Sequence, residues 1–130
     1  MPSTPPPKHL TFIDGLWCHL AEGPVTLTEG VERVTESIAY CRANGILRLL
    51  IDVRAAHGYT PPTLADRYFL AEDRAKAGGG KIRVAIIAPS GLIHPGKFGM
   101  RVANEMGAVA DIFADEVVAR KWLLSDVPPT

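Results

Sequence analysis

Residues 97–124 read KFGMRVANEMGAVADIFADEVVARKWLL, and this stretch predicts how the fold ends. Apolar residues recur at helical spacing over Lys97–Met106 and again over Asp115–Leu124, while Val109–Phe113 is short and mostly apolar. A helix, a short buried strand and a closing helix are typical of the end of a small open α/β sheet. We expect Trp122 to anchor the last helix against that sheet.

Two upstream stretches predict further buried strands. Ile46–Val53 and Lys81–Ala88 are nearly continuous in apolar and branched residues, as in strands that are covered on both faces. Between them, Thr63 followed by Asp66 predicts a capped helix that ends at the glycines of residues 78–80. The residues of this helix expected to face the core are Leu64, Tyr68, Ala71 and Ala75. Because strands and helices alternate, we expect parallel strands and right-handed crossovers.

The N-terminal part of the chain predicts an antiparallel hairpin and a first helix. His9–Ile13 and Leu16–Leu20 are strand-like runs around Asp14-Gly15, a dipeptide that suits a type I′ turn. Thr28 is the expected cap of the helix, and Gly45 the expected stop. The helical residues expected to form its apolar face are Val31, Val34, Ile38 and Cys41.

Length and composition indicate one domain. The chain has 130 residues and an apolar fraction of 47%, which is enough for a hydrophobic core. Met1–Pro7 contains four prolines and predicts a disordered tail, which leaves residues 8–130 as a single α/β domain. Cys18 and Cys41 lack metal-ligand or redox spacing, so we expect reduced, buried thiols and assign no metal and no cofactor.

The charge balance excludes some classes of partner. Lys plus Arg number 14 and Asp plus Glu number 14, so no overall field attracts nucleic acid or an anionic membrane. No apolar run reaches the roughly 20 residues that a membrane span needs, and no secretory signal is visible. We therefore expect a cytoplasmic protein that is not embedded in a membrane.

Candidate site residues lie in the loops that follow the predicted strands, because ligands of open parallel sheets bind outside the carboxyl ends of the strands. The first loop runs from Arg54 to Pro62 and offers a cation, an imidazole and a phenol in Arg54, His57 and Tyr59. The alternative is that these side chains pack over the sheet edge or face solvent.

The second loop, Gly91–Lys97, has the G-x-x-x-x-G-K spacing of a phosphate-binding loop. Phe98 replaces the hydroxyl residue that holds magnesium and Pro95 lacks an N–H donor, so nucleotide hydrolysis is not expected. An anion at the following helix N-terminus, near Lys97 and Arg101, is a simpler expectation. The complete candidate set for a ligand or anion is Arg54, His57, Tyr59, His94, Lys97 and Arg101. We assign no catalytic residue.

The chain resembles the SpoIIAA-like (STAS-type) family at several motifs. They are Phe98-Gly99-Met100 with Asn104, Phe113-Ala114-Asp115 through Trp122-Leu123, and Glu22-Gly23-Pro24-Val25-Thr26 before the first helix. The resemblance implies one α/β domain in which an antiparallel hairpin leads into a mostly parallel open sheet wound with helices. Anti-anti-sigma factors of the wider family carry a phosphorylatable serine at the start of the second helix, whereas Tyr59–Thr63 contains no serine here. Thr60 or Thr63 is the alternative phosphorylation site, although two prolines change the turn.

Three functions remain open at this point. The first is a non-enzymatic binding or regulatory module that uses the loops to bind a protein partner or a small ligand. The second is a carrier of a small apolar or lipid-like molecule, because the family is similar in fold to CRAL-TRIO carriers. Its cleft would lie beneath the second helix, with Arg54 or Lys97 on the head group. The residues expected to line that cleft are Leu64, Tyr68 or Phe69. The third is an enzyme of unknown reaction.

The same patterns give three discriminating expectations. A partner-binding protein should show a largely filled interior and an exposed apolar patch near the second helix. A carrier should hold an enclosed apolar pocket, and an enzyme should show converging polar groups with a perturbed acid or base. The edge of the N-terminal hairpin is also a possible site of pairing in a homodimer.

Overall fold

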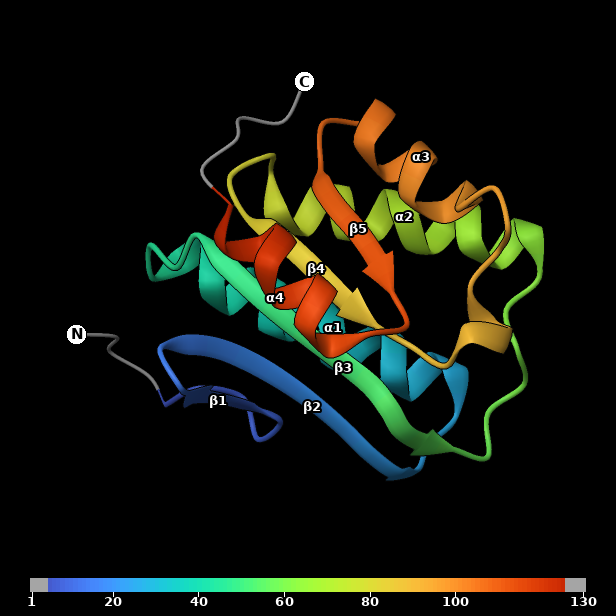
Figure 1. Cartoon of the computed structure of the whole chain (residues 1–130), viewed down its shortest axis with the longest axis horizontal. Helices are drawn as coiled ribbons and strands as arrows, with labels where there is room; N and C mark the ends of the chain where they lie inside the picture. The colour runs from blue at the N-terminus through green and yellow to red at the C-terminus, as the bar shows by residue number, and fades with distance from the viewer. Residues whose placement is uncertain (1–4, 126–130) are drawn as a thin grey trace.

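The computed structural model describes residues 5–125, which form a five-stranded mixed sheet and four α-helices (Figure 1). Strand order in the sheet follows chain order, with one antiparallel pair, β1–β2, and parallel pairing from β2 to β5. The strands are β1 (Leu10–Ile13), β2 (Leu16–Pro24), β3 (Arg48–His57), β4 (Arg83–Ile87) and β5 (Val109–Phe113). The predicted α/β class, with a hairpin before parallel strands, is confirmed. Residues 1–4 of the predicted tail lie outside the described range.

Three helices cover one face of the sheet and the fourth covers the other (Figure 1). The helices are α1 (Leu27–Ala43), α2 (Leu64–Gly78), α3 (Phe98–Glu105) and α4 (Glu116–Leu124), with a short 3₁₀ turn, η1, at Ser90–Leu92. Helices α1, α2 and α3 each connect neighbouring parallel strands, so their common face indicates crossovers of one hand. None of the helices within residues 5–125 is long and apolar enough to cross a membrane.

Local signals account for the ends of these elements. The hairpin turn holds Asp14 at φ +50° and Gly15 at φ +82°, the two positive values that a type I′ turn requires. Helix α1 is capped by Thr26 and not by Thr28, because the Thr26 hydroxyl accepts from the Glu29 N–H while the Glu29 carboxylate accepts from the Thr26 N–H. The predicted cap of α2 by Thr63 is confirmed.

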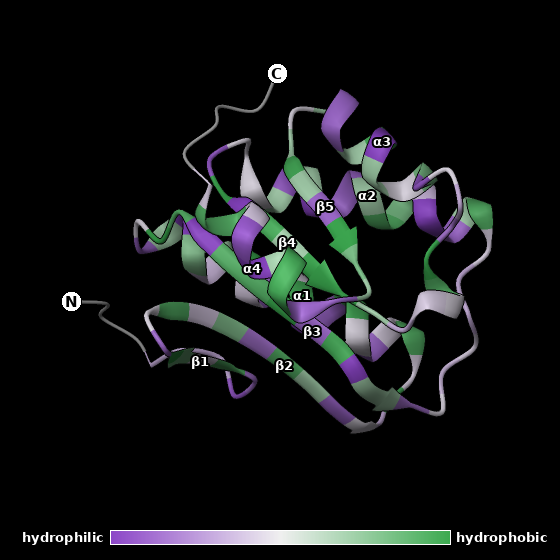
Figure 2. Ribbon diagram, viewed as in Figure 1, coloured by the Kyte–Doolittle hydropathy of each residue, from purple (hydrophilic) through white to green (hydrophobic). Residues whose placement is uncertain are grey.

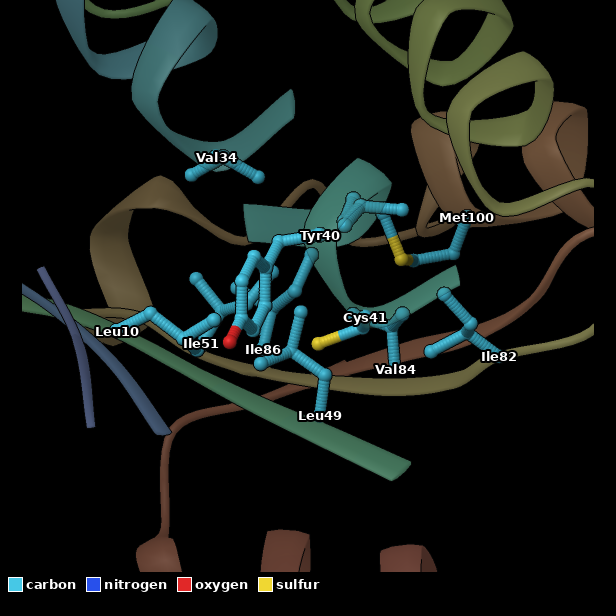
Figure 3. Packing of buried hydrophobic residues seen from close by; sticks show 11 residues of the cluster. Leu10, Val34, Tyr40, Cys41, Leu49, Ile51, Ile82, Val84, Ile86 and Met100 are labelled. Atoms are coloured by element: carbon cyan, nitrogen blue, oxygen red, sulfur yellow. The ribbon is translucent and has the colours of Figure 1, made fainter. Parts of the chain in front are cut away.

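The sheet separates two hydrophobic clusters. The larger, on the side of α1, α2 and α3, includes Ile38, Cys41, Leu49, Ile51, Ile86 and Met100 (Figure 3). The smaller, on the α4 side, consists of Leu16, Cys18, Leu50, Ala85, Ile87, Ala119 and Leu123. Strand β4 contributes to both, and its residues are predominantly hydrophobic in Figure 2. Both cysteines are free and buried, as predicted.

Two sequence-based predictions differ from the structure in ways that matter for function: the end of β3 and the buried face of α2. Strand β3 continues to His57 instead of ending at Val53, because Ala55–His57 pair with Glu22–Pro24 of the long strand β2. Helix α2 buries only part of its predicted face: Ala71 and Ala75 are buried as predicted, but Leu64 and Tyr68 are 54% and 40% exposed. Its buried residues are Ala71, Ala75 and Gly78.

Candidate functional site

A cavity of about 160 Å³, partly open to solvent and thus not the enclosed pocket expected of a carrier, lies between the sheet and helices α1, α2 and α3. Its wall is mainly apolar and includes Ala21, Val31, Val34, Val53, Leu70, Ala71, Ile86, Met100 and Ile112. An apolar cavity of about 150 Å³ is large enough to bind benzene, so this one accommodates an apolar body of about six to eight non-hydrogen atoms. Val34, Ile86 and Met100 are seen on this side of the sheet in Figure 3.

The charged residues around the cavity are predominantly basic. Arg33, Arg67, Arg74 and Lys97 line it, against a single acidic residue, Glu22. Two of the cations are neutralised by carboxylates outside the wall, since Arg33 lies 3.7 Å from Glu29 and Lys97 lies 2.8 Å from Asp111. Arg67 and Arg74 form no ion pair with any residue of the described chain, 5–125. The cavity therefore has a surplus of positive charge.

Arg74 is the most unusual of these groups. Its Nε atom is inaccessible to solvent and has no hydrogen-bond partner, although other parts of the side chain are exposed. Burial lowers the pKa of Arg74 to about 10, so the guanidinium is still charged at neutral pH. The same residue lines a second cavity, of about 20 Å³, toward Ile82 and Val84. Arg74 therefore brings an unpaired cation to the wall of the cavity.

His19 adds a neutral polar group to the wall. It is 1% exposed, and its Nδ1 lies 2.6 Å from the hydroxyl oxygen of Ser37 on α1. Burial, with smaller effects from neighbouring His9, Arg33 and Arg74, lowers the pKa of His19 to about 4. The imidazole is therefore uncharged at neutral pH. Ser37 is fully buried and does not line the cavity, so this pair presents no serine nucleophile to a ligand.

Three of the six candidate residues meet at this cavity. Tyr59, His94 and Lys97 all line it, from the loop after β3 and the loop before α3. His94 is oriented by its own loop, because its Nδ1 accepts from the Gly96 N–H at 3.0 Å. Lys97 adopts φ +49° at the N-cap of α3 and directs its Nζ to Asp111 and to the face of the Phe113 ring. Its ammonium is thus neutralised by Asp111.

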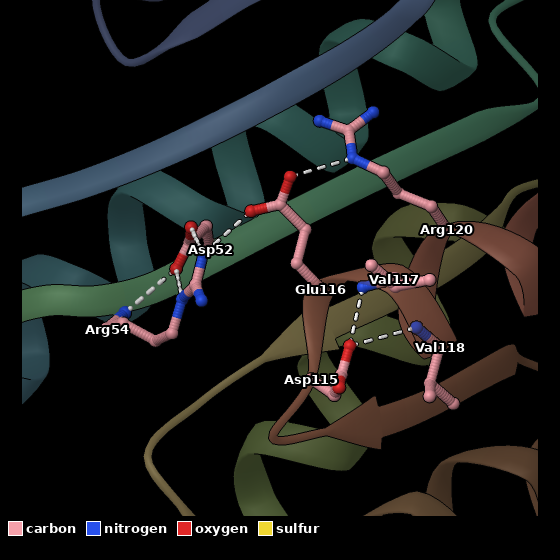
Figure 4. A network of polar contacts seen from close by, with 7 residues as sticks. All are labelled: Asp52, Arg54, Asp115, Glu116, Val117, Val118 and Arg120. Carbon is pink, nitrogen blue, oxygen red and sulfur yellow. Dashed lines mark hydrogen bonds and ion pairs between the residues drawn. The ribbon is translucent and has the colours of Figure 1, made fainter.

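The other three candidates lie elsewhere. Arg54 contacts Asp52 and Glu116 on the α4 side of the sheet, at 2.8 and 2.9 Å, and Glu116 in turn contacts Arg120 at 3.0 Å (Figure 4). These contacts, from Arg120 first and then Arg54, lower the pKa of Glu116. His57 is exposed at the end of β3, and Arg101 is exposed on α3. None of these three lines the cavity.

The cleft predicted beneath α2 is real, but the predicted lining is wrong. Leu64, Tyr68 and Phe69 are 54%, 40% and 61% exposed and contribute nothing to the cavity wall. The Tyr68 and Phe69 rings form an edge-to-face pair, with centroids 5.6 Å apart. They leave an exposed apolar cluster on α2, which is the feature expected of a partner-binding protein.

Sequence reasoning missed the residues that distinguish the cavity chemically. Arg67, Leu70, Ala71 and Arg74 line it from α2 at the i, i+3, i+4, i+7 spacing of a single helix face. That spacing is readable from the sequence, but it contains two arginines, which are usually assigned to the solvent face. His19 was predicted only as part of a strand.

We also searched the described residues for a metal site and compared the chain with known proteins. Within residues 5–125, no group of three or more His, Cys, Asp or Glu side chains is arranged to hold a metal ion. No family model, curated protein or solved structure matches the chain.

Proposed function

We propose that this domain is a non-enzymatic binding module that holds a small, largely apolar molecule between the sheet and helices α1, α2 and α3. The cavity of about 160 Å³ carries the proposal. Ligand sites are typically concave and mainly apolar with a few polar groups, as this cavity is. The bound molecule would have Val53, Ile86 and Met100 along its apolar part.

The fold supports a related proposal about ancestry. We infer a divergent SpoIIAA-like (STAS-type) domain, on the strength of the N-terminal hairpin, the sequential parallel strands and the three-plus-one arrangement of helices. A cytoplasmic location goes with this inference. It is supported by Cys18 and Cys41, which are free thiols buried in different clusters.

Binding is tested by a titration with hexan-1-ol, followed by methyl chemical shifts in NMR spectra. The shifts should concentrate at Val53, Ile86 and Met100 and spare Leu50 and Leu123 of the α4 side. Shifts confined to the α4 side, or no saturable shift, would overturn the proposal.

A cavity-filling variant sharpens this test. Ala71 is buried in the wall, so Ala71→Leu should occupy the space and weaken hexan-1-ol binding about tenfold or more. Ala65→Leu is the matched control, since Ala65 is exposed on the same helix and lies outside the wall. Equal affinities of the two variants would contradict the assignment of the cavity.

The exposed cluster of Leu64, Tyr68 and Phe69 supports a second candidate function, binding of a protein partner. A second copy of the chain is the simplest such partner, and the outer edge of β1 is an alternative contact for a homodimer. Light scattering across a concentration series measures self-association. Phe69→Ser should abolish association through the cluster and leave association through β1 unchanged.

A further inference from the structure

The buried Nε atom of Arg74 lacks the partner that such a group normally has. Buried charged side chains are almost always paired, and a buried donor left without an acceptor is costly. Here Nε has no acceptor, and the guanidinium has no carboxylate within ion-pair distance among residues 5–125. Since Arg74 lines the cavity and its side chain is only partly buried, a bound molecule can supply the counter-charge that the guanidinium lacks.

The neighbouring groups favour a negatively charged acceptor. Arg67 lies two helical turns from Arg74 on the same face of α2 and is also without an ion-pair partner in the described chain. Glu22, the acidic residue of the wall, is not paired with either arginine. His19 is neutral and offers a hydrogen bond without competing as a second charge. The field inside the cavity is therefore positive.

We infer that the ligand is a small organic acid whose carboxylate accepts hydrogen bonds from Arg74, with Arg67 adding to the positive field. This inference rests on the proposed function and specifies its ligand class. A planar guanidinium presents parallel N–H donors that match the two oxygens of a carboxylate. The remaining wall is mainly apolar, so the rest of the acid is a hydrocarbon body, and the whole molecule has about six to eight non-hydrogen atoms.

The test compares hexanoate with hexanamide, which have almost the same shape and differ in charge. Isothermal titration calorimetry of the full chain should show hexanoate binding about tenfold or more tightly. Equal affinities, or a preference for hexanamide, would overturn the inference and leave the proposed binding function standing. Binding of neither compound would also overturn the inference, and the hexan-1-ol titration would then decide whether the binding function stands.

Substitution of Arg74 tests whether this residue causes the preference for hexanoate over hexanamide. Arg74→Met should reduce hexanoate affinity to that of hexanamide, which should itself change little. Lys121→Met is the matched control, because Lys121 is an exposed cation on α4, across the sheet from the cavity. An unchanged preference in Arg74→Met would contradict the role of Arg74.

A measurement on the wild-type chain covers the case in which Arg74→Met does not fold. The Nε–H of a buried arginine exchanges slowly enough to be observed by ¹⁵N NMR. Hexanoate should shift the Arg74 Nε–H signal downfield as it gains a carboxylate acceptor, and hexanamide should shift it less. A signal that does not respond to saturating hexanoate would overturn the inference.

Discussion

The Nδ1 atom of His19 lies 2.6 Å from the hydroxyl oxygen of Ser37, and both side chains are buried. This contact joins β2 to the middle of α1 and fixes the imidazole ring in the wall of the cavity. With Nδ1 engaged, Nε2 is the ring nitrogen left for a ligand. The same imidazole therefore contributes to packing between β2 and α1 and places a neutral polar group in the cavity wall.

Stability should depend on pH through His19. Its pKa is about 4 in the folded chain, against 6.5 for an ordinary histidine. Between about pH 6.5 and pH 4, His19 is therefore protonated in the unfolded chain and neutral in the folded chain. The free energy of unfolding should fall by up to about 3 kcal/mol as pH decreases from about 6.5 to about 4, and not further from this source.

Urea unfolding of the wild type and of His19→Gln, at several pH values in that window, isolates the effect of His19 from that of the carboxylates. The wild type should lose more stability than the variant as pH falls. Parallel losses in the two proteins would show that His19 does not titrate abnormally.

Removal of the Asp111 carboxylate should strengthen anion binding. Asp111 neutralises Lys97, a residue of the cavity wall, at 2.8 Å. Because both side chains are partly exposed, the expected gain in hexanoate affinity for Asp111→Asn is modest, about threefold. Glu105→Gln, an exposed substitution on α3 with the same change in charge, should have no effect. Weaker hexanoate binding by Asp111→Asn would contradict this account of Lys97.

Substitution of Arg54 should change the stability of the fold slightly and should not change ligand affinity. Its side chain is 41% exposed and contacts Asp52 and Glu116, and exposed ion pairs contribute little. Arg54→Met should lower the free energy of unfolding by less than about 1 kcal/mol and leave hexanoate affinity unchanged. A large loss of affinity, measured by calorimetry, would place Arg54 in the site after all.

The two cysteines should be unreactive in the folded chain. Burial raises the pKa of both thiols, that of Cys41 to about 11, so little thiolate is present at about pH 8. Mass spectrometry after iodoacetamide treatment should show no alkylation under native conditions and two alkylated cysteines in urea. Rapid native labelling of Cys41 would indicate that the cluster on the α1–α3 side opens easily.

Local patterns in the sequence were sufficient for most of the fold. The Asp14-Gly15 turn, the Thr63 cap and the strand Val109–Phe113 each depend on a few neighbouring residues, and all three are confirmed. The extension of β3 to His57 depends instead on register with Glu22–Pro24, which no local pattern reveals. The first loop therefore begins after His57, later than predicted, because its start depends on this long-range pairing.

The inward face of α2 was predicted correctly only in its second half. Ala71 and Ala75 are buried as expected, whereas Leu64 and Tyr68, in the first turns of the helix, are largely exposed. The structure buries Ala71, Ala75 and Gly78, and a side chain at Gly78 would lie 3.6 Å from Ile38. Small residues allow this close packing between α1 and the C-terminal half of α2. A cavity formed by such packing cannot be read from sequence periodicity.

The most direct test of ligand binding in the cavity is an isotope-filtered NOESY spectrum of the labelled chain saturated with hexan-1-ol. Our account predicts contacts from the alkyl protons of hexan-1-ol to the side chains of Val53, Ile86 and Met100. Contacts only to the exposed Leu64 and Phe69, or no contacts at saturation, would contradict it.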